Sequence, residues 1–374
     1  GYSFINVGGL AIGMAVAMLI GLWIYDELQF NTYHQNYNQF AQVLRNGTAG
    51  GETFTSPSVP YALADELRTK YGSSFKNVAA AWNVGDHIIS MGSENMSLRG
   101  EFIEPNGPEM FTLKMLQGTW SGLIDQHSVL ISQSAAKLLF GDVDPMCDVL
   151  KIDNTMQAKV TGVYEDLPHN SLFYDVKFFA PFDLIASTNQ WVRYQGFKSN
   201  FLYIYVQIGE NTSFTAASDQ IKDAILNNVR DDMIYVTINP QIFLHPMEKW
   251  RLYPEWKNGI NVGGLIQIVW LFAIVGVFVL LLACINFMNL STARSEKRAK
   301  EVGIRKAIGS ARTQLMNQFF SESFLVVLLG FLIAVLIVSS SLSWFNELAG
   351  KQMEMPWQNR YLWLARFTFV FMTG

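Results

Sequence analysis

Residues 265–288 read LIQIVWLFAIVGVFVLLLACINFM, and no charged side chain occurs between Lys257 and Arg294. An α-helix needs about 20 apolar residues to cross the roughly 30 Å hydrocarbon core of a bilayer. This stretch meets that length, and so do two further apolar runs at residues 5–25 and 324–344. The sequence therefore predicts a chain that crosses a membrane several times.

The first apolar run also has features of a cleaved signal peptide. Such a peptide has a shorter apolar core, a basic start and small residues at the cleavage site. Residues 15–17 (Ala-Val-Ala) imitate that site, but apolar sequence continues beyond them to Tyr25, so a retained helix is the better interpretation. We also expect the chain to be a fragment, because it begins in an apolar run without a methionine. A fourth apolar run, from Leu362, stops at Gly374.

Small residues recur at every fourth position of the first run, at Gly9, Gly13, Ala17 and Gly21. A stripe of this kind lets the backbone of a neighbouring membrane helix approach closely. Glycine is also common in membrane helices without such a role. We interpret the stripe as a helix-packing face.

The charge between the second and third runs predicts the orientation of the chain. Seven basic and two acidic side chains lie between Arg294 and Arg312, a net charge of +5, whereas residues 26–257 carry a net charge of −9. Short Lys/Arg-rich loops stay in the cytoplasm, and long domains translocate largely regardless of charge. The large domain is therefore expected outside. Nucleic-acid binding is a weaker interpretation of a basic segment tied to the bilayer at both ends.

Residues 26–264 have the composition of a soluble domain. Their patterning predicts strands at residues 41–45, 128–132, 157–163, 177–180 and 201–208, and helices at residues 57–71, 133–140 and 215–228. Strands and helices mix without strict alternation, which is typical of an α+β domain.

No pattern of catalytic or metal-binding residues emerges. The five histidines form no His-x-x-x-His pair, Cys147 and Cys284 have no metal-type spacing, and no Gly-x-Ser-x-Gly turn occurs. The adjacent carboxylates Asp65-Glu66, Glu165-Asp166 and Asp231-Asp232 do not face each other on a strand or a helix, so surface charge explains them. We expect no metal and no enzyme activity in this chain.

The segment after the second run reads NFMNLSTARSEKRAKEVGIRKAIGSAR at residues 286–312. It is rich in charged residues, with Val302 and Ile304 among its apolar ones, and Gly303 and Gly309 allow bends. Such a segment could lie along the membrane surface, dock on a cytoplasmic partner or form a plain connecting loop. The residues alone leave these three open. Asn286 and Asn289 are expected to cap the end of the second membrane helix.

This segment carries a resemblance to a known family. Glu301-Val302-Gly303-Ile304-Arg305-Lys306-Ala307-Ile308-Gly309, followed by Gln314, Gln318-Phe319 and Glu322, resembles the signature of MacB/FtsX-type ABC transporter permeases. Residues 139–145 and 162–171 are similar to recurrent turns of the family's periplasmic domain, and residues 4–13 to the first helix of its long permeases with two halves. Met146-Cys147-Asp148 departs from the family's usual apolar residue, Gly and Lys, so we expect an altered turn there.

The resemblance implies a polytopic α-helical membrane protein, the N-terminal half of a long permease, with a MacB-like periplasmic core domain of α+β fold between its first two helices. The implied parts are membrane helix 1 (residues 1–25), the extracytoplasmic domain (26–264), membrane helix 2 (265–290), a cytoplasmic coupling segment (291–318), membrane helix 3 (319–345), an extracytoplasmic loop (346–361) and the start of membrane helix 4 (362–374).

The implied function is that of a permease subunit in the cell inner membrane. Movement of its periplasmic domain, called mechanotransmission, would export or extract a peptide, drug or lipoprotein. ATP and magnesium would bind to separate cytoplasmic ABC ATPase subunits, because this chain has no Gly-x-x-x-x-Gly-Lys-Ser/Thr loop. The residues expected to contact the ATPase are Glu301, Val302, Gly303, Ile304, Arg305, Lys306, Ala307 and Gly309.

Further implied partners are a second permease half or protomer, a periplasmic adaptor or outer-membrane protein, and membrane lipid, with no nucleic acid. Three alternatives stay open. The chain could be a membrane-anchored extracytoplasmic sensor or binding module, a regulator of cell-wall hydrolases, or a membrane-anchored enzyme.

Overall fold

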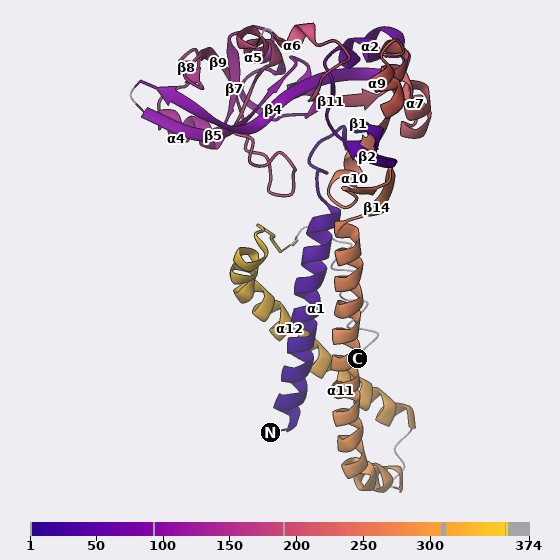
Figure 1. The fold of residues 1–374 in the computed structure, drawn as a ribbon. Coiled ribbons are helices and arrows are strands. Elements are labelled where there is room, and N and C mark those ends of the chain that lie inside the picture. Colours follow the sequence, from indigo (N-terminus) through magenta and orange to yellow (C-terminus); the bar gives the residue numbers. More distant parts are fainter. Residues whose placement is uncertain (1, 93, 190, 308–311, 356, 358–374) are drawn as a thin grey trace. The chain divides into compact units, whose positions relative to one another are not determined.

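The computed structural model describes residues 2–92, 94–189, 191–307, 312–355 and 357. The chain forms two compact units (Figure 1). The helical unit comprises Gly1–Leu28 and Gln267–Gly374, and the α+β unit comprises Gln29–Ile266. Each unit has its own hydrophobic core.

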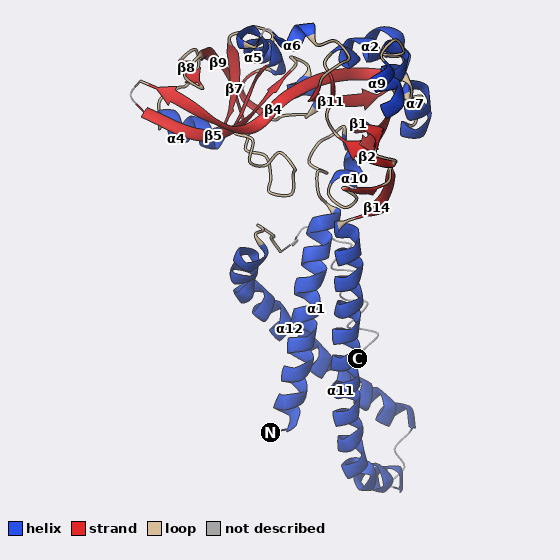
Figure 2. Cartoon of the chain, viewed as in Figure 1, coloured by secondary structure: helices blue, strands red, loops and turns tan. Residues whose placement is uncertain are grey.

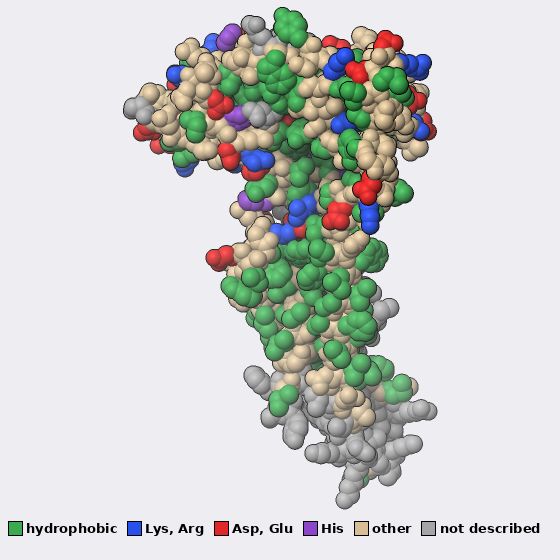
Figure 3. Space-filling view, viewed as in Figure 1, with side chains coloured by type: hydrophobic (Ala, Val, Ile, Leu, Met, Phe, Trp, Pro, Cys, Tyr) green, Lys and Arg blue, Asp and Glu red, His purple; other side chains and the backbone are tan. Residues whose placement is uncertain are grey.

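Three long helices build the helical unit: α1 (Tyr2–Leu28), α11 (Leu265–Ala307) and α12 (Arg312–Ala349). Stretches of all three are long and apolar enough to cross a membrane, at Val7–Leu28, Leu265–Asn289 and Met316–Ala349. Hydrophobic side chains cover most of the described surface of these helices in this view, whereas charged side chains are spread over the α+β unit (Figure 3). The three predicted apolar runs are therefore confirmed as long helices, and the fourth lies outside the described residues.

Helix α11 does not end near residue 290, where the second span was predicted to end. It continues to Ala307 as one helix of 43 residues, about 64 Å long at 1.5 Å per residue. Residues 291–307 contain no proline and are rich in the helix formers Ala, Lys, Arg and Glu. The capping role predicted for Asn286 and Asn289 is therefore wrong, since both lie inside the helix, where backbone groups are already paired.

The α+β unit is built on one large mixed sheet. Its strands are β1 (Phe40–Ala49), β2 (Glu52–Ser56), β3 (Val59–Pro60), β4 (Phe75–Met91), β5 (Glu94–Ile103), β6 (Met115–Gly118), β7 (Ser128–Ser132), β8 (Val149–Ile152), β9 (Met156–Tyr164), β10 (Phe178–Pro181), β11 (Asn200–Ile208) and β12 (Gln241–Pro246). The order is β12-β1-β11-β4-β5-β10-β7-β9-β6, with β2 on β1, β3 on β11, and β8 on β4 and β9. Strand β10 runs parallel to β5 and β7 runs parallel to β9; the other pairs are antiparallel. A separate hairpin joins β13 (Glu255–Lys257) to β14 (Ile260–Gly263).

Short helices surround this sheet (Figure 2). They are α2 (Ala62–Lys70), α3 (Gly107–Met110), α4 (Gln133–Phe140), α5 (Phe182–Thr188), α6 (Trp191–Tyr194), α7 (Phe214–Ile221), α8 (Ala224–Asn228), α9 (Met233–Ile238) and α10 (Met247–Trp250). Helices α2, α7 and α9 gather at the β1 end, and α4 and α5 lie nearer β7 to β9 (Figure 1). The predicted α+β class is confirmed.

Both faces of the sheet are buried, and β11 separates the two sides. Its residues Leu202 and Ile204 belong to a core with Leu63 of α2, whereas Tyr205 packs with Phe40 and Phe111 in a second core. Alternate side chains of β11 therefore point into two different apolar cores. Neither set points into solvent.

Two predicted helices differ from the structure. The helix predicted at 57–71 begins only at Ala62, because residues before proline avoid the helical conformation and Val59–Pro60 pairs with β11 instead. The helix predicted at 215–228 is divided into α7 and α8. The break lies at the carbonyl of Lys222, which accepts a hydrogen bond from the amide of Ile242 in β12 at 2.9 Å.

The turn that the sequence predicts to be altered lies at Met146-Cys147-Asp148, and the structure gives its backbone conformation. Cys147 has φ +73°, the left-handed conformation that glycine adopts most easily. Its amide donates to the Val160 carbonyl at 2.9 Å, and the Val160 amide donates to Asp148 at 2.8 Å. These two hydrogen bonds hold the chain in the left-handed turn. A glycine would adopt this backbone conformation without steric strain, whereas Cys147 adopts it at a cost in free energy.

Candidate functional site

The membrane helices meet at two of the predicted small residues. A side chain at Gly13 would collide with the Ala283 methyl group of α11, and one at Gly9 would lie 3.2 Å from Asn286 Nδ2. Seven residues after Gly13, Ile20 lies over Gly276, which stands seven residues before Ala283. Helices α1 and α11 thus pack antiparallel in a constant register. At each of these contacts, a glycine of one helix leaves room for the other helix to approach closely.

The other half of the predicted stripe has a different environment. Ala17 is half-buried, whereas Gly21 is exposed and a side chain there would meet no described atom within 4 Å. On α12, Gly330 faces Met14, whose Cε would lie 3.2 Å from an added side chain. Of the three glycines in the predicted stripe, Gly9 and Gly13 therefore lie at close helix contacts, whereas Gly21 does not.

Charged side chains join the end of α1 to the segment that follows α12. The Lys351 ammonium pairs with the carboxylates of Asp26 and Glu27, the latter at 2.7 Å, and lies 5.8 Å from the centre of the Trp23 ring. Glu27 is 1% exposed. Gly350 ends α12 with φ +63° and so turns the chain toward this cluster.

The predicted ATPase-contact residues lie at the far end of α11. Residues 301–307 form the last two turns of this helix, and Gly309 lies outside the described residues. Ile304 is the member whose side chain is described, and it is 56% exposed. An exposed apolar side chain on a charged helix end is available to a partner.

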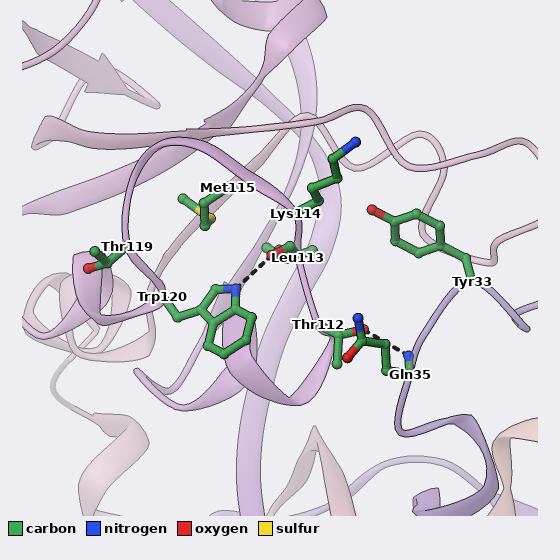
Figure 4. Close-up of a pocket in the computed structure, with 8 residues that line it drawn as sticks. All are labelled: Tyr33, Gln35, Thr112, Leu113, Lys114, Met115, Thr119 and Trp120. Atoms are coloured by element: carbon green, nitrogen blue, oxygen red, sulfur yellow. Dashed lines mark hydrogen bonds between the residues drawn. The ribbon is translucent and has the colours of Figure 1, made fainter.

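A pocket of about 540 Å³ opens in the α+β unit (Figure 4). It is lined by Tyr33, Gln35, Thr112, Leu113, Lys114, Met115, Thr119 and Trp120. The Trp120 indole donates to the Leu113 carbonyl at 2.6 Å, and the Gln35 amide donates to Thr112 Oγ1 at 3.0 Å (Figure 4). Its volume suits a small ligand with an apolar part.

Thr112 is the strained residue of this pocket. Its φ is +50°, which is rare for a β-branched residue. The Lys114 ammonium is paired with Glu165 at 2.7 Å, so the charge of this pocket wall is largely neutralised. The sequence analysis missed the pocket because residues 33–35 and 112–120 meet only in the folded unit.

Several titratable groups are buried in the core of the α+β unit. Burial raises the pKa of Glu101 to about 8, although Tyr205 and Arg99 partly offset it. Burial lowers the pKa of His34 to about 4; its Nδ1 lies 2.6 Å from the Phe111 carbonyl. These groups are neutral at pH 7 and shielded from solvent. Within the part of the chain that the structure describes, no three His, Cys, Asp or Glu residues could hold a metal ion.

Five of the six predicted surface carboxylates are paired with basic side chains: Asp65, Glu66, Glu165, Asp166 and Asp232. Asp65 lies 2.8 Å from Arg68, and Glu66 lies 2.7 Å from Lys70. Burial raises the pKa of Asp166, but hydrogen bonds from Lys177 and Ser134 outweigh it and leave the pKa lowered. Such surface pairs are structural, each contributing about 1 kcal/mol or less.

Two family models match the chain over most of its length. Residues 3–224 match the MacB-like periplasmic core domain, and residues 273–373 match the FtsX-like permease C-terminal region. The chain therefore belongs to the family of MacB/FtsX-type ABC transporter permeases. Its α+β unit is a MacB-like periplasmic core domain.

Known proteins of this family share about a quarter to a third of their aligned residues with this chain. The uncharacterized ABC transporter permease YknZ of Bacillus subtilis is 24% identical over 229 residues, covering 61% of this chain and 52% of that protein. The macrolide export ATP-binding/permease protein MacB of Sodalis glossinidius is 35% identical over 295 residues, covering 77% and 40%. The chain thus spans about half the length of these relatives. A domain of a putative permease from Porphyromonas gingivalis has 16% identity and a TM-score of 0.46, over 63% of this chain and 98% of that domain.

Proposed function

We propose that this chain is the permease subunit of an ABC transporter and converts ATP hydrolysis on a separate cytoplasmic subunit into movement of its periplasmic core domain. The observation that carries this proposal is the continuity of α11. One helix runs from Leu265, which directly follows the last hairpin of the domain, to Ala307 at the predicted ATPase contact. A rigid helix transmits displacement from one end to the other.

In this proposal, the partner subunit binds ATP and this chain supplies the contact and the moving domain. ATP and magnesium would bind to the partner subunit, because the chain has no phosphate-binding loop. Residues 301–307 and Gly309 would contact that subunit on the cytoplasmic side of the inner membrane. The +5 charge between Arg294 and Arg312 supports this orientation. A second permease half or protomer would complete the assembly, and a periplasmic adaptor or outer-membrane protein could receive the substrate.

The substrate would be handled by the periplasmic domain, as a peptide, drug or lipoprotein. The MacB relative is named for macrolide export, which makes a drug one candidate class for this chain. Movement of the core domain would then release the substrate on the outer side of the membrane.

The test removes two opposite charges from the predicted contact. Full-length protein carrying Glu301→Ala and Arg305→Ala should no longer co-purify with an ABC ATPase subunit, while membrane insertion stays normal. The matched control carries Glu66→Ala and Lys70→Ala, which removes an i,i+4 charge pair of the α+β unit. This control should keep the ATPase subunit bound.

Unchanged co-purification and unchanged ATPase activity in the double variant would contradict the assignment of the contact. If no ATPase subunit binds the wild-type protein and deletion of residues 301–309 has no effect, the transporter proposal itself fails. A membrane-anchored sensor would then be the better description.

A further inference from the structure

Two segments far apart in the sequence line the pocket of the α+β unit. Residues 112–115, 119 and 120 belong to one segment, and Tyr33 and Gln35 belong to the other (Figure 4). The Gln35 amide joins them by its hydrogen bond to Thr112 Oγ1, and Thr112 has the rare φ of +50°. Strained backbone persists only where its surroundings hold it firmly, and it clusters at ligand sites. The lining of this pocket is therefore fixed before any ligand enters.

The two aromatic rings of the pocket are held in defined orientations. The Trp120 indole uses its only donor on the Leu113 carbonyl, at 2.6 Å. The Tyr33 ring packs edge-on against His34, with 5.5 Å between ring centres, and His34 Nδ1 lies 2.6 Å from the Phe111 carbonyl. Trp120 is 42% exposed. Because its N–H is already bonded, the surface that the indole offers to a ligand is apolar.

The remaining lining combines adaptable apolar surface with neutral polar groups. Met115 is unbranched and repacks easily against ligands of different shape. The Gln35 side chain offers two N–H donors and one acceptor oxygen. Among the eight described lining residues Lys114 alone carries a charge, and its ammonium is paired with Glu165 at 2.7 Å. A charged ligand would lose hydration in this site without gaining a free counter-charge.

We propose that this pocket binds an uncharged small molecule whose flat apolar body packs against the Trp120 indole. The volume of about 540 Å³ is within the roughly 300–1,000 Å³ usual for small-molecule sites. Rings that are already oriented lose little conformational freedom when a ligand binds. The rings offer area, not a pattern of hydrogen bonds, so the site selects for flatness and absence of charge and accepts varied shapes.

This inference concerns the periplasmic core domain alone, since both lining segments belong to the α+β unit. Within the proposed function, it assigns a site to the drug class of substrate. It holds whether or not an ATPase subunit binds the chain. Failure of the co-purification test and failure of this site are therefore separate results.

The test captures ligands on a thiol placed at the pocket. The native thiols are first removed by Cys147→Gly and Cys284→Ala, and Thr119→Cys supplies the new one. The full chain in detergent is equilibrated with the disulfides of phenylethanethiol, cysteamine and mercaptoethanesulfonate in the presence of mercaptoethanol. Mass spectrometry then measures the ratio of the uncharged aromatic adduct to the mean of the two charged adducts. This ratio should be about tenfold higher than at the control position, because burial of the ring against Trp120 favours the aromatic adduct.

The matched control is Thr155→Cys, in the turn between β8 and β9. Thr155 and Thr119 are both exposed, and each hydroxyl makes a local hydrogen bond, to the Asp153 carbonyl at 3.3 Å and with Ser121 Oγ at 2.7 Å. The same detergent surrounds both variants, so a difference between them reports on the pocket. Equal ratios at the two positions would overturn the proposal, and so would a preference for either charged adduct at position 119.

Removal of the indole tests the wall that the ligand contacts. Trp120→Ala in the Thr119→Cys protein should lower the ratio to that of the control, whereas Leu116→Ala should leave it unchanged. Leu116 is a neighbouring apolar residue of similar exposure, 45%, outside the lining. Thermal unfolding of each variant verifies that the protein is folded, and an undiminished ratio in folded Trp120→Ala would overturn the contact.

Competition with a free ligand gives a measurement that does not depend on the Trp120 variant. Indole, a flat uncharged molecule, should reduce formation of the aromatic adduct at position 119 and leave position 155 unaffected. A phenylalanine-containing tripeptide that competes where indole does not would assign the pocket to a side chain of a polypeptide, and so overturn the small-molecule proposal. Absence of competition by both would overturn it as well.

Discussion

The Lys351 ammonium lies 2.7 Å from Glu27 Oε1, although Glu27 ends the first membrane helix and Lys351 follows the third. Both side chains are nearly withdrawn from solvent, at 10% and 1% exposure. Asp26 pairs with the same ammonium, so one cation serves two carboxylates. This contact ties the outer ends of α1 and α12 together.

Replacing Lys351 by methionine should destabilise the helical unit. The substitution keeps a long apolar stem but leaves Glu27 buried without its cation, which costs about 3–5 kcal/mol when one partner of a buried pair is removed. Thermal unfolding of the full chain in detergent measures the loss. Glu354→Ala, at an exposed position of the same segment, is the control and should unfold like the wild type.

The Lys351→Met, Glu27→Gln double variant separates charge from packing. It removes most of the uncompensated charge, so part of the lost stability should return. A double variant that is less stable than Lys351→Met alone would contradict an electrostatic role for the pair.

The contact of Gly13 with α11 predicts that the effect of a glycine-to-alanine substitution on stability depends strongly on its position along α1. Gly13→Ala should force the two helices apart, because its added methyl group collides with Ala283, and overpacking of this kind costs about 1–3 kcal/mol. Gly21→Ala adds the same methyl group where no described atom lies within 4 Å. It should leave the unfolding temperature unchanged or raise it slightly, since alanine favours the helix. Equal effects at the two positions would exclude a packing role specific to Gly13.

Buried Glu101 makes the stability of the periplasmic core domain depend on pH. Its pKa is raised by burial from 4.5 in the unfolded chain to about 8 in the folded one. The unfolded state therefore loses the proton first, so the contribution of Glu101 to folding stability is fully present below pH 4.5 and is lost as pH rises toward 8. At pH 7 the loss is about 3 kcal/mol.

Glu101→Gln should remove this dependence, because glutamine is neutral in both states. The variant should unfold at higher temperature than the wild type at pH 7, and the difference should nearly disappear at pH 4.5. Urea or thermal unfolding at several pH values measures it. A constant difference between variant and wild type across this range would show that Glu101 does not titrate on unfolding.

The left-handed conformation of Cys147 predicts a stabilising substitution. Cys147→Gly should raise the free energy of unfolding by about 1 kcal/mol. A residue with a side chain is destabilised by roughly 1–2 kcal/mol in this conformation, and glycine removes that strain. The greater conformational entropy of glycine in the unfolded chain offsets part of the stabilisation. Cys147→Ala keeps a side chain at the same φ and should give no such gain. If alanine and glycine act alike, strain at this position is not the cause.

Local patterns in the sequence were sufficient for some elements of the domain. Strand β7 and helix α4 have the predicted bounds, because an apolar run, a capping Ser132 and a terminating Gly141 are all contained within fourteen residues. The long β4–β5 hairpin was missed. Its strands mix residues such as Asp86, His87 and Asn95 with apolar ones, and their structure depends on distant neighbours β11 and β10.

The sequence by itself determined the three apolar helices and the family, and it predicted the side of the membrane on which each loop lies. Transfer of apolar residues into lipid and the distribution of Lys and Arg act over contiguous stretches of chain. Only the tertiary structure decided the Lys351–Glu27 pair, the burial of Glu101, the left-handed turn at Cys147 and the pocket beside Trp120. Each depends on groups far apart in sequence or on a backbone conformation imposed by its surroundings, and such contacts leave no periodic signal in the chain.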